Sequence, residues 1–214
     1  MKLFTLGATG RTGQEVVKQA TELGYDIVAY VRSPEKMKIQ KNIEIVQGEL
    51  NDDKKMEQAM TSCNAVLVTL GNPVKDSSAD LFGSLMPRLV KIMGKAKVKR
   101  IVSLSSMGTG ETILNVSYPY KIGVKTFLKG NQADHEKGEK YLAESNLDWT
   151  LVYPGPLFDG PKTKDPLVKD AASGYKMPGA PKTNRADVAA VMLDQLNKKD
   201  SYRKKLVMCS KQED

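Results

Sequence analysis

The sequence predicts an α/β fold, a doubly wound parallel sheet in a single domain with a small substrate lobe formed by loops of its C-terminal part. Short β-branched runs alternate along the chain with longer amphipathic stretches, which is typical of βαβ units. A glycine-rich segment follows the first of these runs, as in Rossmann-like sheets. The length of 214 residues suits one domain, so we expect residues 1–214 to form it.

The alternation defines the expected elements in chain order. Seven strands are expected at Lys2–Leu6, Asp26–Val31, Ile43–Val46, Ala65–Leu70, Arg100–Leu104, Thr150–Tyr153 and Leu206–Cys209. Five helices are expected at Gly13–Leu23, Asp53–Met60, Ala79–Lys95, Ala133–Glu144 and Arg185–Leu196. Residues 106–132 and 155–184 are too long for simple connections. Because long loops in a compact domain are usually functional, we expect both to be substrate-side loops.

Composition restricts the class of protein. Apolar residues make up 40% of the chain and charged residues 27%, and no apolar run approaches the roughly 18 residues of a membrane span. The opening MKLFTLGATG reads as a strand and not as a signal peptide, so a cytoplasmic location is expected. Cys63 and Cys209 lie far apart and His135 is the single histidine, so no metal site is expected.

The net charge of +8 favours an anionic ligand. The lysines are scattered and form no basic stripe interleaved with aromatic residues, so a nucleic-acid partner is not expected. A phosphate-rich cofactor would suit the positive net charge as well as a nucleic acid would.

The glycine-rich segment reads Gly7, Ala8, Thr9, Gly10, Arg11, Thr12 and Gly13. Its glycines allow a tight turn, close approach of the backbone to a pyrophosphate, and tight packing of a helix on a strand. The N-terminus of the following helix attracts phosphate charge. The spacing of three and three departs from the two and three of the usual dinucleotide fingerprint. We expect these seven residues to bind a dinucleotide, with a turn that binds no ligand as the alternative.

The end of the second strand indicates which dinucleotide is preferred. An NAD site normally has an acid there, whereas this chain has Arg32 followed by Ser33. A cation and a hydroxyl suit a 2′-phosphate, and Arg11 could complete a two-arginine clamp on it. The alternative is that Arg32 is a surface residue beside a short helix at Ser33-Pro34-Glu35.

Six segments in chain order carry a resemblance to a known family: GATGRTG, AYVRSPEKM, VQGELND, LVTLGN, RIVSLSSMG and ADHEKGEKYLAESNLDWTLVYPGPL. They resemble the atypical short-chain dehydrogenase/reductases with NmrA-like NAD(P)H-binding domains, and within them the biliverdin-IXβ reductase and flavin reductase group. The resemblance covers nearly the whole chain and implies NADPH as the cofactor.

The resemblance also implies roles for individual residues. It places the adenine at Glu49 and Leu50, and the adenosine ribose and pyrophosphate at Leu70 and Gly71. It places the nicotinamide beside the turn formed by Tyr153, Pro154, Gly155 and Pro156. Ser106 matches the serine near the nicotinamide and substrate and is the candidate catalytic residue, with Ser105 beside it. The alternative for both serines is a hydrogen bond to the backbone.

One departure from the broader dehydrogenase pattern bears on the chemistry. Those enzymes use a Tyr with a Lys four residues later, which lowers the pKa of the phenol for proton exchange. None of the eight tyrosines here has Lys at that offset. Reduction of a conjugated acceptor needs less, because hydride enters a delocalised system and water can supply the proton. His135 is a weaker acid-base candidate, and a helix-start residue interacting with Asp134 is the alternative.

The expected function is therefore an NADPH-dependent reductase of a flavin, quinone or bilin-like acceptor, with a monomer or a dimer as the oligomeric state. Tyr118, Tyr120 and Phe127 alternate with lysines and could stack on such an acceptor, or they could belong to an amphipathic helix. Met107 and Trp149 are expected to be packing residues. A non-catalytic, NmrA-like redox sensor that binds NADP(H) is the alternative function. A sugar-nucleotide epimerase is disfavoured by the missing Tyr/Lys pair.

Overall fold

The structure is a computed structural model that describes residues 1–37, 41–71, 80–126 and 128–211. Its strands are β1 (Lys2–Leu6), β2 (Asp26–Val31), β3 (Ile43–Gln47), β4 (Ala65–Val68), β5 (Arg100–Leu104), β6 (Asp148–Pro154), β7 (Leu157–Phe158), β8 (Leu167–Asp170), β9 (Thr183–Asn184) and β10 (Lys204–Cys209). Its α-helices are α1 (Arg11–Glu22), α2 (Asp53–Met60), α3 (Leu81–Lys95), α4 (Tyr120–Thr126), α5 (Lys129–Ala143) and α6 (Arg185–Gln195). Short 3-10 helices are η1 (Pro34–Lys36), η2 (Gly110–Asn115), η3 (Ala171–Ser173) and η4 (Lys199–Ser201).

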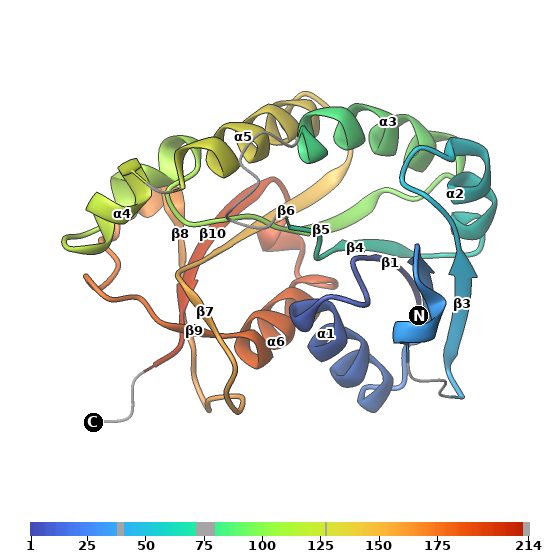
Figure 1. Cartoon of the computed structure of the whole chain (residues 1–214), viewed down its shortest axis with the longest axis horizontal. Helices are drawn as coiled ribbons and strands as arrows, with labels where there is room; N and C mark the ends of the chain where they lie inside the picture. The colour runs from blue at the N-terminus through green and yellow to red at the C-terminus, as the bar shows by residue number, and fades with distance from the viewer. Residues whose placement is uncertain (38–40, 72–79, 127, 212–214) are drawn as a thin grey trace.

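The central sheet has eight strands in the order β3-β2-β1-β4-β5-β6-β10-β8. All neighbouring pairs are parallel except β10 and β8, which are antiparallel. Helices α2, α3 and α5 cover one face, and α1 and α6 cover the other (Figure 1). This arrangement confirms the predicted Rossmann-like, doubly wound α/β class.

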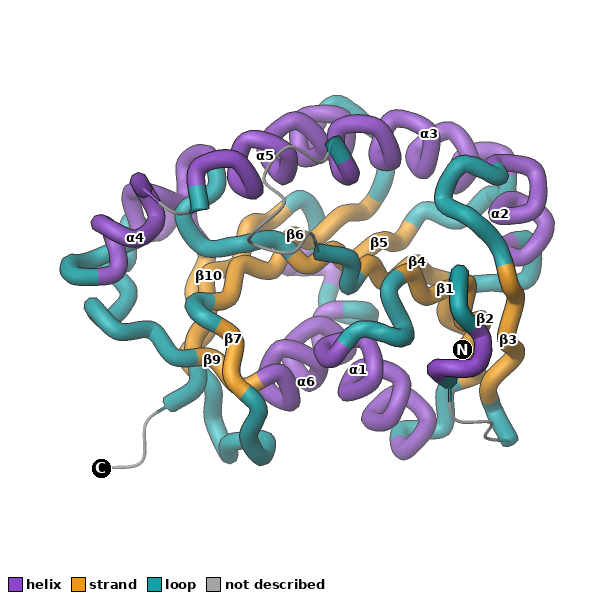
Figure 2. The backbone as a smooth tube through the Cα atoms, in the orientation of Figure 1, coloured by secondary structure: helices purple, strands orange, loops and turns teal. Residues whose placement is uncertain are grey.

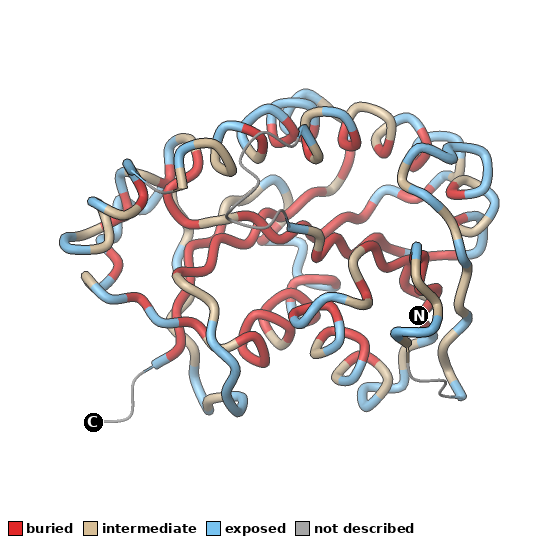
Figure 3. Tube along the Cα trace, viewed as in Figure 1, coloured by how far each residue is buried: buried red, intermediate tan, exposed pale blue. Residues whose placement is uncertain are grey.

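The sheet separates two apolar cores. The core on the α2, α3 and α5 face includes Phe4, Leu89 and Trp149, and the core on the α1 and α6 face includes Val16 and Met192. Figure 3 shows the central strands buried along their length, because helices cover both faces. Trp149 is buried, as is Met107, so the packing roles expected for them are confirmed.

The two segments predicted to be loops contain regular structure, and the prediction of seven strands was therefore too low. Residues 155–184 contribute β8 to the edge of the main sheet, while β7 and β9 form a separate two-stranded parallel sheet (Figure 2). These strands are two to four residues long and only partly buried, so they leave no apolar run in the sequence. Their pairings join residues far apart in the chain, which periodicity does not detect.

The other long segment contains η2, α4 and the start of α5. Helix α4 has Val124 buried and Lys125 exposed, as the amphipathic-helix alternative requires, whereas Tyr118 precedes the helix and is exposed. Phe127 lies outside the described residues. Helix α5 begins at Lys129, so His135 lies in its second turn, and its prediction as a helix-start residue was wrong. Among the described residues no helix is both long enough and apolar enough to cross a membrane.

Candidate functional site

The sequence-predicted site residues come together along one edge of the sheet. Strands β1 to β6 are parallel, so their carboxyl ends lie at the same edge, where doubly wound sheets bind ligands. The glycine loop follows β1, Arg32 and Ser33 follow β2, and Glu49 and Leu50 follow β3. Leu70 and Gly71 follow β4, Ser105 and Ser106 follow β5, and the 153–156 turn ends β6.

The glycine loop presents an uncapped helix N-terminus at this edge. Gly7 has a φ of 87°, and its carbonyl accepts a hydrogen bond from the Gly10 amide at 2.9 Å. Gly10 is the N-cap of α1, which has neither a side-chain cap nor an acidic residue in its first turn. Helices α2 and α3 differ, because the Asp52 carboxylate caps the first and Asp134 caps the second. No side chain among the residues that the structure describes caps the first amides of α1, so the N-terminus of this helix suits an anion supplied by a ligand.

Two glycines of the loop allow α1 to pack closely on the end of β1. A Cβ on Gly13 would lie 2.0 Å from the Gly7 carbonyl oxygen, and a Cβ on Gly7 would lie 2.7 Å from the Thr69 carbonyl carbon. Gly10 differs, since its nearest neighbour would be the Gly7 oxygen at 3.2 Å and nothing else lies within 4 Å. Gly7 and Gly13 thus serve packing, whereas a Cβ on Gly10 would make one tight contact, with the Gly7 oxygen.

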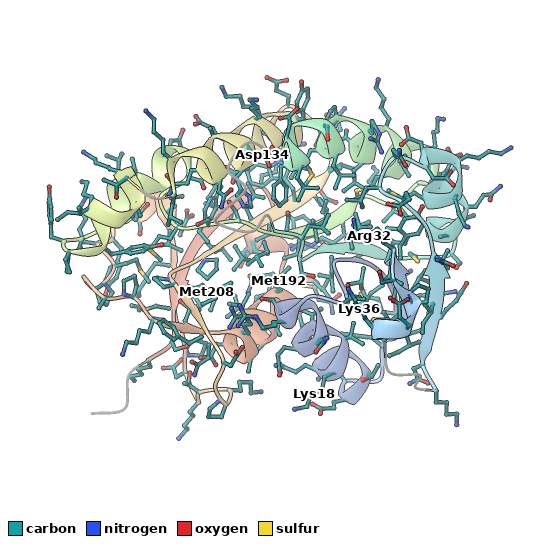
Figure 4. All side chains as sticks on the ribbon, viewed as in Figure 1. Lys18, Arg32, Lys36, Asp134, Met192 and Met208 are labelled. Carbon is teal, nitrogen blue, oxygen red and sulfur yellow. The ribbon has the colours of Figure 1, made fainter. Side chains whose placement is uncertain are left out.

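The two arginines of the predicted clamp have different surroundings. Arg32 is exposed, and Figure 4 shows it on the β2 side of the sheet. The short helix expected after it is present as η1, although the Ser33 side chain does not cap that helix. The Arg11 guanidinium forms an ion pair with Asp159, at 3.2 Å. Whether the two arginines share a phosphate stays a prediction.

Other contacts hold the loops after β3 and β4 in place. The Tyr30 hydroxyl donates to the carbonyl of Glu49 at 3.0 Å, and the Arg88 guanidinium donates to the carbonyl of Leu50. Leu70 is half-buried and Gly71 is exposed. These positions suit the adenosine contacts that the resemblance implies, and those roles stay predictions.

Backbone hydrogen bonds between the β5 and β6 segments continue past the carboxyl end of β5. The Ser105 amide donates to the Val152 carbonyl at 2.8 Å, and the Met107 amide donates to the Pro154 carbonyl at 3.1 Å. Ser106 is half-buried, and within the described residues its hydroxyl has no hydrogen-bond partner. That hydroxyl is therefore available to a ligand at the edge, as the predicted role requires.

A buried carboxyl group from α5, Glu139, connects β5 with β6. It accepts hydrogen bonds from the Ser105 hydroxyl at 2.6 Å and from the Tyr153 hydroxyl at 2.7 Å. Burial raises the pKa of Glu139, and the two hydrogen bonds act in the opposite direction. The backbone alternative for the Ser105 hydroxyl is thus wrong. Sequence reasoning missed Glu139 because a Glu in the segment EKGEKY looks like part of a solvated helix face.

The phenols near this network are not activated. Burial, followed by the charge of Glu139 and its hydrogen bond, raises the pKa of Tyr153 well above its ordinary value. Burial also raises the pKa of Tyr120 to about 12. The Tyr153 side chain is fully buried, so it supports the 153–156 turn and does not reach the surface of the edge. A phenol with a raised pKa exchanges protons less readily near neutral pH.

His135 and Asp134 serve the packing of α5 on α3. The Asp134 carboxylate accepts hydrogen bonds from the amides of Leu81, Phe82 and Gly83 at 2.9–3.1 Å (Figure 4). The His135 ring stacks on Phe82 with ring centroids 4.0 Å apart. Burial lowers the pKa of His135 to about 4, so the imidazole is neutral at pH 7. This geometry favours a structural role over acid-base chemistry.

One cavity touches the glycine loop: it measures about 270 Å³ and is lined by Ala8 together with Lys36 and Met37 after β2. A cavity of about 800 Å³ runs between α1 and α6, lined by residues such as Lys18 and Asp194. No group of three or more His, Cys, Asp or Glu side chains that could hold a metal ion occurs among the described residues.

The glycine loop yields a paired prediction. Gly10→Val should keep the fold, because its Cβ meets only one atom and that contact is relieved by a small shift. It should lose dinucleotide binding, because the added side chain would cover the N-terminus of α1. Gly13→Val should lose about 2 kcal/mol or more of stability, because overpacking costs about 1–3 kcal/mol and here the clash is with backbone. Thermal melts and dinucleotide titrations of both variants test this. A Gly10→Val variant that binds like the wild type would remove the loop from the site.

The buried carboxyl group yields a pH-dependent prediction. With its pKa raised above the ordinary 4.5, folded Glu139 holds a proton that the unfolded chain releases as the pH rises past that value. Its contribution to stability is therefore full at low pH and decreases as the pH rises through the raised pKa. Glu139→Gln should lack this decrease. Glu139→Ala should lose about 2–6 kcal/mol, because it orphans two hydroxyls at a cost of about 1–3 kcal/mol each.

Chemical denaturation at several pH values measures these differences. Glu144→Gln, at the exposed C-cap of the same helix, is the matched control and should follow the wild type at every pH. Parallel curves for Glu139→Gln and the wild type would show that Glu139 titrates normally.

The chain is similar to a known protein family and to several known proteins. A family model described as NAD(P)H-binding matches residues 7–199. A chloroplastic protein of Arabidopsis thaliana is 30% identical over 192 residues, which cover 82% of this chain and 66% of that protein. The oxidoreductase stcQ of Emericella nidulans is 29% identical over 195 residues, which cover 80% of this chain and 67% of that protein. The chain thus spans about two thirds of these relatives.

Solved structures share the fold. The oxidoreductase ylbE from Lactococcus lactis has a TM-score of 0.81 at 24% identity, covering 99% of this chain and 92% of that one. A short-chain dehydrogenase/reductase from Veillonella parvula in complex with NADP has a TM-score of 0.80 at 21% identity, covering 98% and 94%. ChuY, an anaerobilin reductase from Escherichia coli O157:H7, has a TM-score of 0.82 at 18% identity, covering 100% and 99%.

The family model covers most of the chain and begins at the first glycine of the loop. The resemblance drawn from the six sequence segments is thereby confirmed. The chain belongs to this NAD(P)H-binding family, and NAD(P)H is its cofactor.

Proposed function

We propose that this protein is an NADPH-dependent reductase that transfers hydride to a conjugated small-molecule acceptor of the flavin, quinone or bilin class. The observation that carries the proposal is the absence of an activated phenol from the described part of the edge. Tyr120 and Tyr153 have raised pKa values, and no tyrosine in the sequence has Lys four residues later. A conjugated acceptor suits such a site because it delocalises the hydride and takes its proton from water.

Several residues would hold the cofactor in this proposal. The glycine loop would bind the pyrophosphate at the N-terminus of α1, and Arg32 with Ser33 would bind the 2′-phosphate of NADPH. Ser106 would orient the nicotinamide or the acceptor through its unpaired hydroxyl. The bound dinucleotide supplies the hydride, and the protein supplies orientation and exclusion of water.

The lobe formed by η2, α4 and η3 exposes apolar side chains that suit an apolar, planar acceptor. Four of the eight exposed large hydrophobic side chains of the described residues belong to it: Leu114, Tyr118, Ile122 and Tyr175. Lys125 and Lys129 are exposed in the same lobe and would suit an acceptor with carboxylate or phosphate groups.

Two relatives lend support to the reaction class. The Emericella nidulans protein is named an oxidoreductase, and ChuY is named an anaerobilin reductase. The second name supports a bilin among the acceptor classes.

Steady-state NADPH oxidation against a panel of flavins, quinones and bilins tests the proposal. We expect turnover with at least one acceptor class, and Gly10→Val should abolish it. If wild-type protein binds NADPH in a titration and is silent across the panel, the reductase proposal fails. The non-catalytic redox sensor then becomes the better function.

Arg32→Ala tests cofactor choice. The variant should bind NADPH more weakly by about 1.5–3 kcal/mol, the range for a hydrogen bond to a charged group, with NADH nearly unaffected. Lys199→Ala removes one exposed positive charge far along the chain and is the matched control. Binding titrations with both nucleotides give the result, and equal losses for NADPH and NADH would show that Arg32 does not contact the 2′-phosphate.

A further inference from the structure

Asp159 lies between two arginines beside the glycine loop. One carboxylate oxygen is 2.7 Å from Nη1 of Arg185, and the other is 3.2 Å from Nη1 of Arg11. Arg11 is the first residue of α1, and Arg185 is the first residue of α6. The carboxylate therefore connects the N-termini of the two helices that cover this face of the sheet.

The two ion pairs differ in how firmly they are held. The Arg185 side chain is only 9% exposed, and the pairing of β7 with β9 places Phe158 opposite Asn184, so Asp159 follows directly beside Arg185. The Arg11 side chain is 71% exposed and reaches Asp159 across the surface, through the longer contact. An exposed ion pair of this kind is weak and is readily exchanged for another anion.

A dinucleotide would bring such an anion. Its pyrophosphate would lie at the uncapped N-terminus of α1, within the reach of a side chain that starts at the first residue of that helix. Arg11 then has two alternative partners, the pyrophosphate and the Asp159 carboxylate. Asp159 keeps a partner when Arg11 leaves, because Arg185 remains in contact with it.

We propose that Asp159 is an internal competitor for Arg11 that sets dinucleotide affinity. Without dinucleotide, Asp159 occupies Arg11 and tethers the 155–184 segment to the glycine loop. Dinucleotide binding transfers Arg11 to the pyrophosphate, leaves Asp159 on Arg185 and frees the tether. The inference rests on dinucleotide binding at the glycine loop and does not depend on the acceptor.

Titration of NADPH and NADH, followed by their fluorescence, tests the competition without turnover. Asp159→Asn should bind both nucleotides about two- to fivefold more tightly, a gain of the size of one exposed ion pair. In an Arg11→Ala background the same substitution should give little or no gain. Asp165→Asn is the matched control, since this exposed acid of the same segment pairs with Lys211 and should leave the affinity unchanged.

Three results would overturn the inference. Unchanged or weaker binding by Asp159→Asn would show that Asp159 does not compete. An equal gain in the Arg11→Ala background would reduce its role to general charge repulsion, and a gain for NADPH alone would assign Arg11 to the 2′-phosphate. A thermal melt without nucleotide is the second measurement, because Asp159→Asn should melt no higher than the wild type. Tighter binding by a variant with a raised melting temperature would instead reflect general stabilisation.

Discussion

The close approach of α1 to the end of β1 is the constraint on which the candidate site depends. The Gly7 carbonyl oxygen occupies space that a Cβ on Gly13 would need. Only glycine permits this contact, and the contact fixes where the helix N-terminus points. Because α1 also packs on α6, the same contact determines how Arg11 and Arg185 come to flank one carboxylate. A backbone contact at one glycine thus positions the charges around the dinucleotide site.

Helix α5 has a comparable role on the opposite face of the sheet. It contributes two buried carboxyl groups, of which Asp134 satisfies the first amides of α3 and Glu139 joins the ends of β5 and β6. Buried carboxyl groups are costly unless hydrogen-bonded, and both of these have several donors. The two groups are expected to make the α3–α5 layer and the carboxyl edge rigid together. Ser106 follows Ser105 in the chain, so the hydrogen bond between Ser105 and Glu139 also helps to hold Ser106 in place.

The sequence predicted the alternating strands and helices of the main sheet. Seven parallel strands and their covering helices follow from alternating apolar periodicity, and the glycine loop follows from its motif. Short strands such as β7 and β9 could not be predicted, because their pairing depends on chain segments more than twenty residues apart. Glu139 and Asp159 were also missed. Glu139 lies in the charged segment EKGEKY and looks solvated, and Asp159 lies in a stretch rich in glycine and proline. The roles of both depend on partners brought near by the tertiary structure.

The chemistry of the edge follows from what burial does to its titratable groups. Burial raises the pKa of Tyr153 and of Glu139 and lowers that of His135, so each group favours its uncharged form. Tyr153 is fully buried and His135 stacks on Phe82, so these groups support the edge and supply no acid or base at its surface. Near the glycine loop the Arg11 guanidinium suits phosphate recognition, and the Asp159 carboxylate paired with it opposes phosphate binding. An edge whose described residues include no activated phenol and no charged histidine fits the proposed hydride transfer to an acceptor that needs no protein acid.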